Sequence, residues 1–215
     1  MRYDLIVWDF DGTLADTFDL TVSVYNDLAL RHGLRPVESP ASLRGLTTRA
    51  FLRRHNVPLL RLPRLLREHQ AAARGRMGSV RLFDGVPDLL RRLRAGGCRL
   101  AVLSSNAAEN IQGCLAANGV EGLFEFVVGY PRLFGKGVVL RRLLRREGLA
   151  PSRLLYVGDE VRDVRAASRA GVDSAAVSWG FQAPELLARL GPTYLWSDPG
   201  EALAVLLAGG HADSA

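Results

Sequence analysis

The strongest constraint on the fold of this chain is a short apolar run that ends in two aspartates. Residues 5–8 read Leu-Ile-Val-Trp, and Asp9, Phe10, Asp11 and Gly12 follow directly. A continuous apolar run of this length predicts a strand that is buried on both faces, as in a parallel sheet. Because the chain turns at Gly12, Asp9 and Asp11 can both face one pocket at the carboxyl end of that strand. Open α/β sheets bind ligands at this edge, so the two aspartates are candidate functional residues.

Two carboxylates this deep in a fold are costly unless positive charge compensates them. A divalent cation can provide that charge. Carboxylate oxygens suit Mg²⁺, which typically takes one or two carboxylates together with waters and a phosphate oxygen. The alternative is a strand followed by a turn in which Asp11 and Gly12 only set the backbone geometry. Other parts of the chain have to separate these two interpretations.

From residue 82 onward the pattern alternates between helices and strands. This alternation predicts a doubly wound, Rossmann-like parallel sheet of the α/β class. The last part of the chain predicts two short helices in 184–207 around an edge strand at 194–196, then a disordered tail at 208–215. The other strands are expected at 99–103, 124–128, 154–157 and 174–177, and the other helices from Pro87 to Gly96 and at 107–118, 136–147 and 161–170.

The segment between the first strand and residue 82 has a different pattern. Apolar residues recur at helical spacing in 16–32, which Gly33 follows, and helices are also expected from Thr47 or Thr48 to Arg54 and over 62–77. No stretch of it alternates with the period of a strand. We therefore expect an all-helical cap at residues 16–81, inserted into a core formed by residues 1–15 and 82–215.

The charge of the chain is concentrated in this helical insert. The net charge is +6, and residues 16–81 hold 12 arginines and 5 acidic residues, whereas the remainder holds 16 basic and 17 acidic residues. A basic insert above a nearly neutral core fits a lid that attracts small anionic molecules better than it fits nucleic-acid binding. A solvated arginine-rich helical surface explains the same distribution.

Compartment and membrane association can also be predicted. The apolar runs are shorter than the roughly 18 residues that a spanning helix needs, and a strand begins almost at the N-terminus, without room for a signal peptide. The two cysteines, Cys98 and Cys114, have no metal-binding spacing and are too few for a disulfide framework, so we expect buried thiols. These features predict a cytoplasmic protein with no membrane association.

Further polar residues follow later strands. Ser104, Ser105 and Asn106 lie between an expected strand and a helix, where hydroxyls and free backbone amides can bind a phosphate, although a plain helix cap explains them as well. Lys136, the single lysine of the chain, begins an expected helix. In a sequence that otherwise uses arginine, a lone lysine suggests a position that needs a compact ammonium group.

The last acidic pair stands at residues 159 and 163. Asp159 ends an expected strand after Gly158, and Asp163 lies one turn into the following helix on the same side. One carboxylate of this pair can bind Mg²⁺ directly, and the other through water or Lys136. Glu160 is explained by the preference of helix N-termini for acidic residues.

These residues together resemble the phosphatase branch of the haloacid dehalogenase superfamily. The sequence Asp-Phe-Asp-Gly-Thr-Leu at 9–14 looks like its first motif, and Ser104, Lys136 and the Gly-Asp-x-x-x-Asp sequence at 158–163 match the second, third and fourth motifs in family order. The resemblance implies that Asp9 is the nucleophile and Asp11 the general acid and base. It also implies that Ser104, Ser105, Asn106 and Lys136 bind phosphate, and that Asp9, Asp11, Asp159 and Asp163 form the Mg²⁺ site.

The nearest resemblance is to phosphoglycolate phosphatase-like members with a small helical cap. It implies Mg²⁺-dependent hydrolysis of a small phosphorylated metabolite through an aspartyl-phosphate, by a monomer or homodimer that binds neither nucleic acid nor membrane. Arg44 and Arg49 of the cap are candidate substrate contacts. Two alternatives stay open: a sugar-phosphate mutase with the same core residues, and a non-catalytic protein that uses the basic cap to bind nucleic acid or protein.

Overall fold

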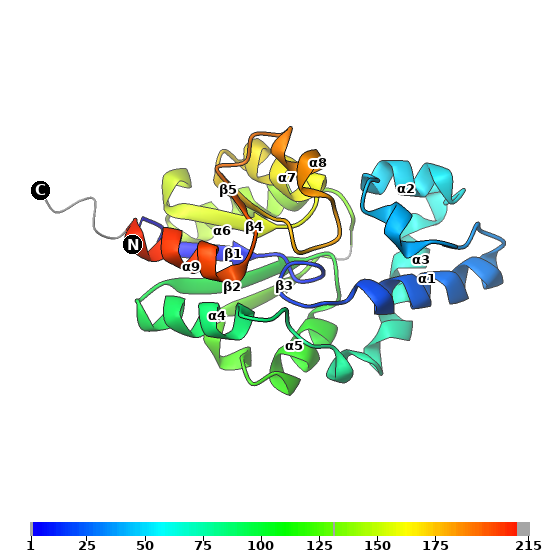
Figure 1. The fold of residues 1–215 in the computed structure, drawn as a ribbon, viewed down its shortest axis with the longest axis horizontal. Helices are drawn as coiled ribbons and strands as arrows, with labels where there is room; N and C mark the ends of the chain where they lie inside the picture. The colour runs from blue at the N-terminus through cyan, green and yellow to red at the C-terminus, as the bar shows by residue number, and fades with distance from the viewer. Residues whose placement is uncertain (1, 131, 210–215) are drawn as a thin grey trace, which may run out of the picture.

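The centre of the molecule is a six-stranded sheet in which every neighbouring pair of strands is parallel (Figure 1). The computed structural model describes residues 2–130 and 132–209. The strand order is β3-β2-β1-β4-β5-β6, so the apolar run that precedes Asp9 forms a central strand. The strands are β1 (Leu5–Trp8), β2 (Arg99–Ser104), β3 (Phe126–Gly129), β4 (Leu154–Gly158), β5 (Asp173–Val177) and β6 (Tyr194–Trp196).

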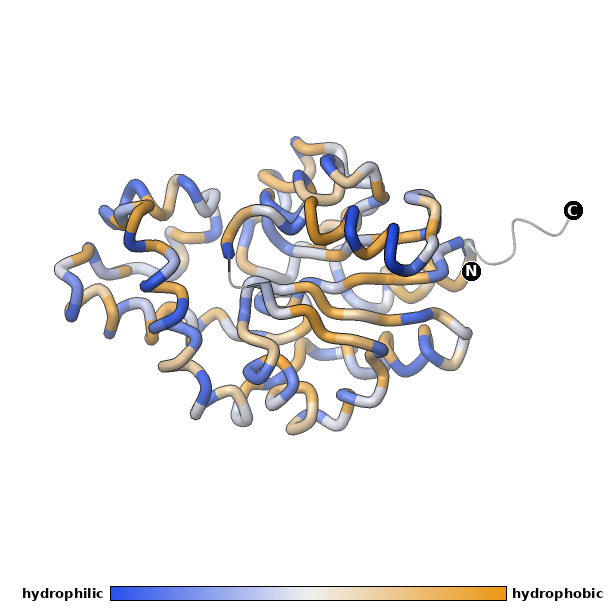
Figure 2. Tube along the Cα trace, turned by 180° about the vertical axis from the view of Figure 1, so that it is seen from behind, coloured by the Kyte–Doolittle hydropathy of each residue, from blue (hydrophilic) through white to orange (hydrophobic). Residues whose placement is uncertain are grey.

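Helices cover both faces of the sheet, which confirms the predicted doubly wound class. Ile6 and Trp8 of β1 pack with one set of helices and Leu5 and Val7 with the other, because successive side chains of a strand point to opposite faces. The first set is α4 (Val86–Ala95), α5 (Ala108–Ala117) and α9 (Pro199–Ala208), and the second is α6 (Lys136–Glu147) and α7 (Val161–Ala170), with α8 (Pro184–Ala188) against α7. Apolar residues accordingly run through the strands (Figure 2).

A group of helices lies beyond the carboxyl ends of the strands (Figure 1). It contains α1 (Phe18–His32), α2 (Thr48–Arg54) and α3 (Leu62–Arg74), with short 3₁₀ turns between them and no strand among these described residues. Local signals set its helix ends. Gly33, at a φ of 64°, ends α1, and the Thr47 hydroxyl accepts a hydrogen bond from the Ala50 amide at 3.3 Å at the start of α2.

The two connections between these helices and the sheet lie side by side. The amide of Asp16 donates to the carbonyl of Arg81 at 3.0 Å, and the amide of Phe83 donates to the carbonyl of Leu14 at 3.0 Å. The chain therefore leaves and re-enters the sheet region through one narrow, hydrogen-bonded pair of segments.

Several predicted bounds differ from the structure by one to three residues, and the first helix of the insert begins at Phe18 rather than residue 16. The third helix of the insert ends at Arg74 rather than Met77, since Gly75 follows, and the edge strand β3 begins at Phe126 rather than Phe124. The predicted disordered tail was placed at 208–215. Ala208 is the last residue of α9, and residues 210–215 lie outside the described residues.

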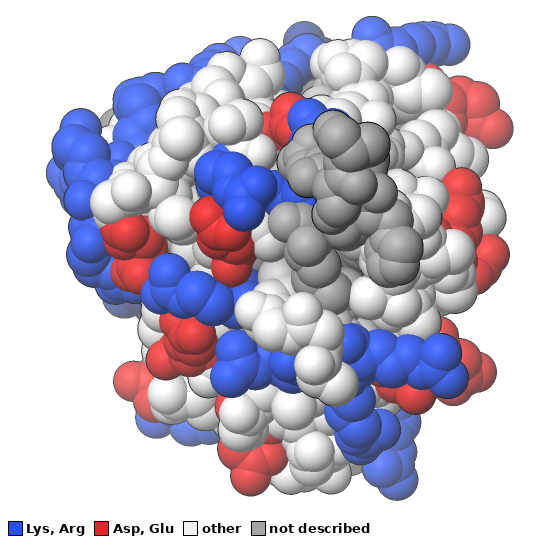
Figure 3. All heavy atoms as spheres, turned by 90° about the vertical axis from the view of Figure 1, so that its left-hand side faces the viewer, with Lys and Arg blue, Asp and Glu red and all other residues white. Residues whose placement is uncertain are grey.

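The end of the molecule away from α1–α3 carries basic and acidic side chains next to one another (Figure 3). Ion pairs at the amino ends of the strands include Arg2 with Asp173 at 2.7 Å and Arg99 with Glu125 at 2.8 Å. Within the described part of the chain, no helix has the length and apolar character required to cross a bilayer. Cys98 and Cys114 are buried free thiols, as predicted.

Candidate active site

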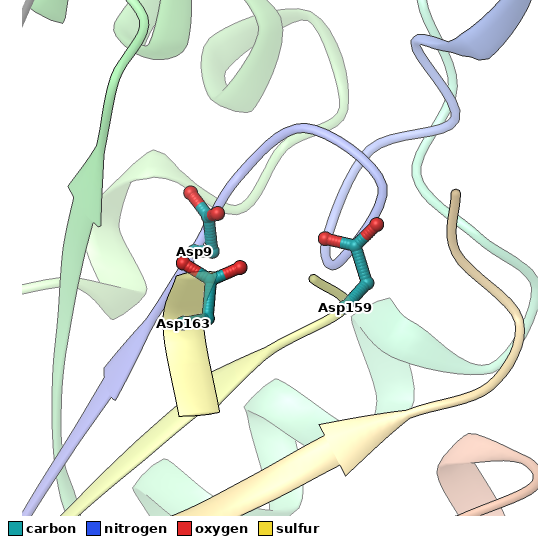
Figure 4. A group of neighbouring side chains, drawn as sticks. All are labelled: Asp9, Asp159 and Asp163. Atoms are coloured by element: carbon teal, nitrogen blue, oxygen red, sulfur yellow. The ribbon is translucent and has the colours of Figure 1, made fainter. Parts of the chain in front are cut away.

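Three buried carboxylates from separate segments meet at the carboxyl edge of the sheet (Figure 4). Asp9 follows β1, Asp159 follows β4, and Asp163 lies in the first turn of α7. One oxygen of each lies within 4.8 Å of the others, and none of the three side chains is more than 1% exposed. This edge therefore concentrates negative charge where water cannot screen it.

The single lysine of the chain lies against two of these carboxylates. Lys136 Nζ is 2.5 Å from Asp9 Oδ2 and 2.8 Å from Asp163 Oδ1, and the side chain is 2% exposed. Burial lowers the pKa of Lys136, but Asp163 and Asp9 outweigh that effect and leave the pKa raised. The ammonium group therefore stays charged and holds both carboxylates from the first turn of α6.

The environment gives the three carboxyl groups different pKa values. Burial raises the pKa of Asp9 to about 6, against the lowering effect of Lys136. Burial together with the nearby Glu160, Asp163 and Asp9 raises the pKa of Asp159 well above its usual range. The pKa of Asp163 is lowered because Lys136 and Arg162 outweigh its burial. Asp159 is thus the carboxylate whose charge the protein compensates least.

The donor set around Asp159 fits a divalent cation. Its oxygens accept hydrogen bonds from Thr13 Oγ1 at 3.0 Å and from the Phe181 amide at 2.7 Å. Among the described residues, no lysine or arginine forms an ion pair with it. Three carboxylates facing one ammonium leave an excess of negative charge, and hard oxygen donors suit Mg²⁺.

Asp11, the second aspartate of the first motif, lies outside this group of three carboxylates. Asp11 accepts hydrogen bonds from Asn106 Nδ2 at 3.1 and 3.2 Å and from Ser104 Oγ at 3.5 Å, and its carboxylate is not part of the three-carboxylate cluster. Ser104, at the end of β2, also accepts a hydrogen bond from the Asn106 amide at 3.2 Å. These contacts hold Asp11 on the side of the cluster that faces α1–α3, where it lines a cavity of about 240 Å³.

The turn after Asp9 needs glycine at residue 12. Gly12 has a φ of 75°, and a Cβ atom added there would overlap the carboxylate of Asp159. Gly180, in the loop after β5, packs as closely, since an added Cβ would overlap the Gly12 carbonyl and Asp159. Both loops can therefore pack this closely against Asp159 only because glycine, which has no side chain, occupies residues 12 and 180.

Several residues at the site were missed in the sequence. Arg162 pairs with Glu160 and donates to Ser105 Oγ at 3.1 Å, and its position between the acids of the fourth motif was a usable signal. The Tyr156 hydroxyl donates to Asp163 Oδ1 at 3.3 Å, and a tyrosine in an otherwise apolar strand was a weaker one. The amide of Phe181 has no local sequence signal.

The two arginines predicted to contact substrate lie outside the cavity beside Asp11. Arg44 is exposed, and its carbonyl accepts a hydrogen bond from the Ala183 amide at 2.9 Å. The guanidinium of Arg49 is 5.5 Å from the centre of the Phe134 ring. Neither lines the cavity, and their role as substrate contacts stays a prediction.

Comparison with known proteins points to a hydrolase family. Residues 6–177 match the family described as haloacid dehalogenase-like hydrolase. The chain is 36% identical over 200 residues to the phosphoglycolate phosphatase of Synechococcus elongatus, an alignment that covers 92% of this chain and 94% of that protein. It is also 32% identical over 193 residues to the tyrosine-protein kinase PtkA of Mycobacterium tuberculosis, covering 82% of this chain and 62% of that protein.

Solved structures share the fold. A structure described as a predicted phosphatase from Clostridium acetobutylicum superposes with a TM-score of 0.82 at 22% sequence identity, and covers 97% of this chain and all (100%) of that chain. At this identity the likeness concerns the arrangement of the sheet and helices, and the chemistry has to be argued from the residues themselves.

Proposed function

This chain belongs to the haloacid dehalogenase-like hydrolase family, and from that premise we propose that it is a Mg²⁺-dependent phosphatase of small phosphate monoesters. As a member with phosphoglycolate phosphatase relatives, it is a phosphoric monoester hydrolase. The observation that carries the finer proposal is the geometry of Asp9, held at 2.5 Å by Lys136 in a buried cluster, with Asp11 held separately on the open side. Two carboxylates in different environments suit two chemical roles.

The first step is attack of the Asp9 carboxylate on phosphorus. An oxygen–phosphorus bond forms on Asp9 as the bond from phosphorus to the ester oxygen breaks, and Asp11 gives its proton to the leaving alkoxide. The ammonium of Lys136 keeps Asp9 ionised and offsets charge on the phosphoryl group. The product is an alcohol and an aspartyl-phosphate.

The second step regenerates the enzyme. Asp11, now ionised, takes a proton from a water molecule that attacks the phosphoryl group, and the bond to Asp9 breaks to release inorganic phosphate. We assign the binding of phosphoryl oxygens to Ser104, Ser105, Asn106 and Lys136. When bound by Asp9 and Asp159, with Asp163 and the Asp11 backbone as further ligands, Mg²⁺ would supply positive charge to those oxygens.

We also propose that residues 1–15 and 82–215 form the catalytic core and residues 16–81 a cap that covers the site. The paired connections at Leu14–Phe83 and Asp16–Arg81 support this division. Contacts across it include Gln70 Nε2 with the Ser105 carbonyl at 2.6 Å. A cytoplasmic location fits the two buried free thiols.

The test is hydrolysis of p-nitrophenyl phosphate with and without Mg²⁺. We expect turnover that requires the metal and is abolished in Asp9→Asn, and a phosphoryl adduct on the Asp9 peptide after acid quenching. Asp88→Asn, at an exposed carboxylate of α4, is the matched control and should keep full activity. Full turnover by Asp9→Asn would contradict the nucleophile. Phosphoglycolate is the first natural ester to test, given the relative from Synechococcus elongatus.

A further inference from the structure

The cavity beside Asp11 is where the alcohol part of a substrate must lie. This cavity of about 240 Å³ begins at Asp11, Ser105 and Asn106 and extends between α1, α2 and α3. In the proposed mechanism, Asp11 protonates the leaving oxygen. The group attached to that oxygen therefore occupies the space that Asp11 lines.

The walls of this cavity are mainly aliphatic and aromatic. The helices contribute Phe18, Tyr25, Phe51 and Leu66, Leu46 lies in the loop before α2, and Phe181 faces them from the loop after β5. An apolar cavity of about 150 Å³ is enough to bind benzene, so this larger one can hold a substituted aromatic ring. A two-carbon group would leave much of the apolar wall without contact.

The cavity also lacks a free positive charge for a carboxylate. Among the described lining residues, Arg162 is the single arginine or lysine, and its guanidinium pairs with Glu160 and donates to Ser105 Oγ and the Leu133 carbonyl. His69 is largely buried, which lowers its pKa, and its ring nitrogen lies 3.2 Å from the Thr21 carbonyl. The described lining therefore offers a bound carboxylate no cationic side chain that is not already paired.

One polar group of the lining has no partner. The Thr17 side chain is 1% exposed, and its hydroxyl has no hydrogen-bond partner among the described residues. A buried hydroxyl without a partner is unfavourable, so a ligand with a neutral polar group would gain a hydrogen bond there.

We propose that the substrates are phosphate monoesters of neutral, largely apolar alcohols, such as aryl or arylalkyl alcohols, and that esters carrying a carboxylate are disfavoured. This inference depends on the proposed phosphatase activity. A carboxylate in the cavity would lose its hydration without gaining a cationic partner. Phosphoglycolate is such an ester.

The test compares kcat/KM for benzyl phosphate, 4-carboxybenzyl phosphate and 4-carbamoylbenzyl phosphate in Mg²⁺. The three leaving groups are similar in reactivity, and the carbamoyl compound separates size from charge. We expect benzyl and carbamoylbenzyl phosphate to exceed the carboxylate by at least about tenfold, and both to exceed phosphoglycolate. A preference for phosphoglycolate or the carboxybenzyl ester, with p-nitrophenyl phosphate hydrolysed normally, would overturn the inference alone. No hydrolysis of any ester would overturn the phosphatase proposal and the inference with it.

A charge introduced into the cavity gives an independent readout. Leu66→Lys places a cation in the lining, and we expect the ratio of kcat/KM for carboxybenzyl over benzyl phosphate to rise at least about tenfold. Leu60→Lys is the matched control, because Leu60 is 98% exposed and outside the lining, and its ratio should not change. Equal kcat/KM ratios in a folded Leu66→Lys variant and in the control would contradict the assignment of the cavity as the site that binds the alcohol part of the substrate.

Discussion

Replacement of Lys136 by methionine tests whether one ammonium group holds the site together. Lys136 Nζ contacts Asp9 and Asp163 at 2.5 and 2.8 Å, and all three side chains are at most 2% exposed. Methionine fills similar space but leaves two buried carboxylates unpaired. Loss of one partner of a buried ion pair typically costs about 3–5 kcal/mol, and we expect Lys136→Met to lower the free energy of unfolding of the metal-free protein by that amount near pH 7.

The effect should depend on pH in a defined direction. Lys136 lowers the pKa of Asp9, which is about 6 with the lysine present, so the variant raises that pKa further. The folded variant then binds protons that the unfolded chain has released. Stability falls with pH wherever the folded state binds more protons, so the loss should be larger near pH 8 than near pH 6. Mg²⁺ should restore part of it.

Urea unfolding with and without Mg²⁺ measures these changes. We expect kcat/KM for p-nitrophenyl phosphate to fall at least about 100-fold, since one preorganised donor to a developing charge contributes about 100- to 1,000-fold. Arg142→Met removes an exposed charge from the same helix and should change stability by at most about 0.5 kcal/mol. An unchanged unfolding midpoint in Lys136→Met, or kcat/KM within about threefold of the parent, would contradict this role of Lys136.

Two further predictions concern Mg²⁺ binding and the turn at Gly12. Because the pKa of Asp9 is about 6 and that of Asp159 is raised well above its usual range, Mg²⁺ competes with protons. Calorimetry should show at least about tenfold weaker binding at pH 5 than at pH 7, and equal affinities would contradict this. Gly12→Ala should destabilise the protein by about 1–3 kcal/mol and abolish activity, because the φ of 75° is strained and the Cβ overlaps Asp159. Gly33→Ala is the control for backbone strain alone, because Gly33 has a φ of 64° with open space around it, and this variant should stay active. Equal losses of stability and activity in the two variants would argue against the overlap with Asp159.

The parts of this fold that local signals specify were predictable. Residues 136–147 and 161–170 form the expected helices with the expected bounds, because Gly148 and Gly171 end them at φ values of 64° and 75°. The same holds for the central strand, whose apolar run has no polar interruption before Asp9. The carboxyl ends of parallel strands meet at one edge, so convergence of Asp9, Ser104 and Asp159 followed from the strand pattern alone.

Contacts between distant segments were not predictable in this way. The Phe181 amide reaches Asp159 from a loop 22 residues later, and nothing in that loop indicates the contact. The cavity is a second example. Helical periodicity in 16–32 and 62–77 predicts apolar faces, but the same pattern serves a packed interface and the wall of a cavity. Whether a packed interface or a cavity results depends on how the three helices pack against one another, and their separate sequence patterns do not specify this.

The choice of lysine at residue 136, where the rest of the chain uses arginine, follows from the space between the carboxylates. The ammonium nitrogen lies between Asp9 Oδ2 and Asp163 Oδ1, with the Tyr156 ring centre 5.6 Å away. Helices α6 and α7 pack closely beside it, since a Cβ added at Gly137 would come within 2.9 Å of the Ala166 carbonyl. A planar guanidinium needs more room and donates in one plane, whereas an ammonium donates in three directions from a single atom. Two carboxylates that converge from a strand end and a helix therefore favour the smaller cation, and the third, Asp159, forms no ion pair with a lysine or arginine among the described residues.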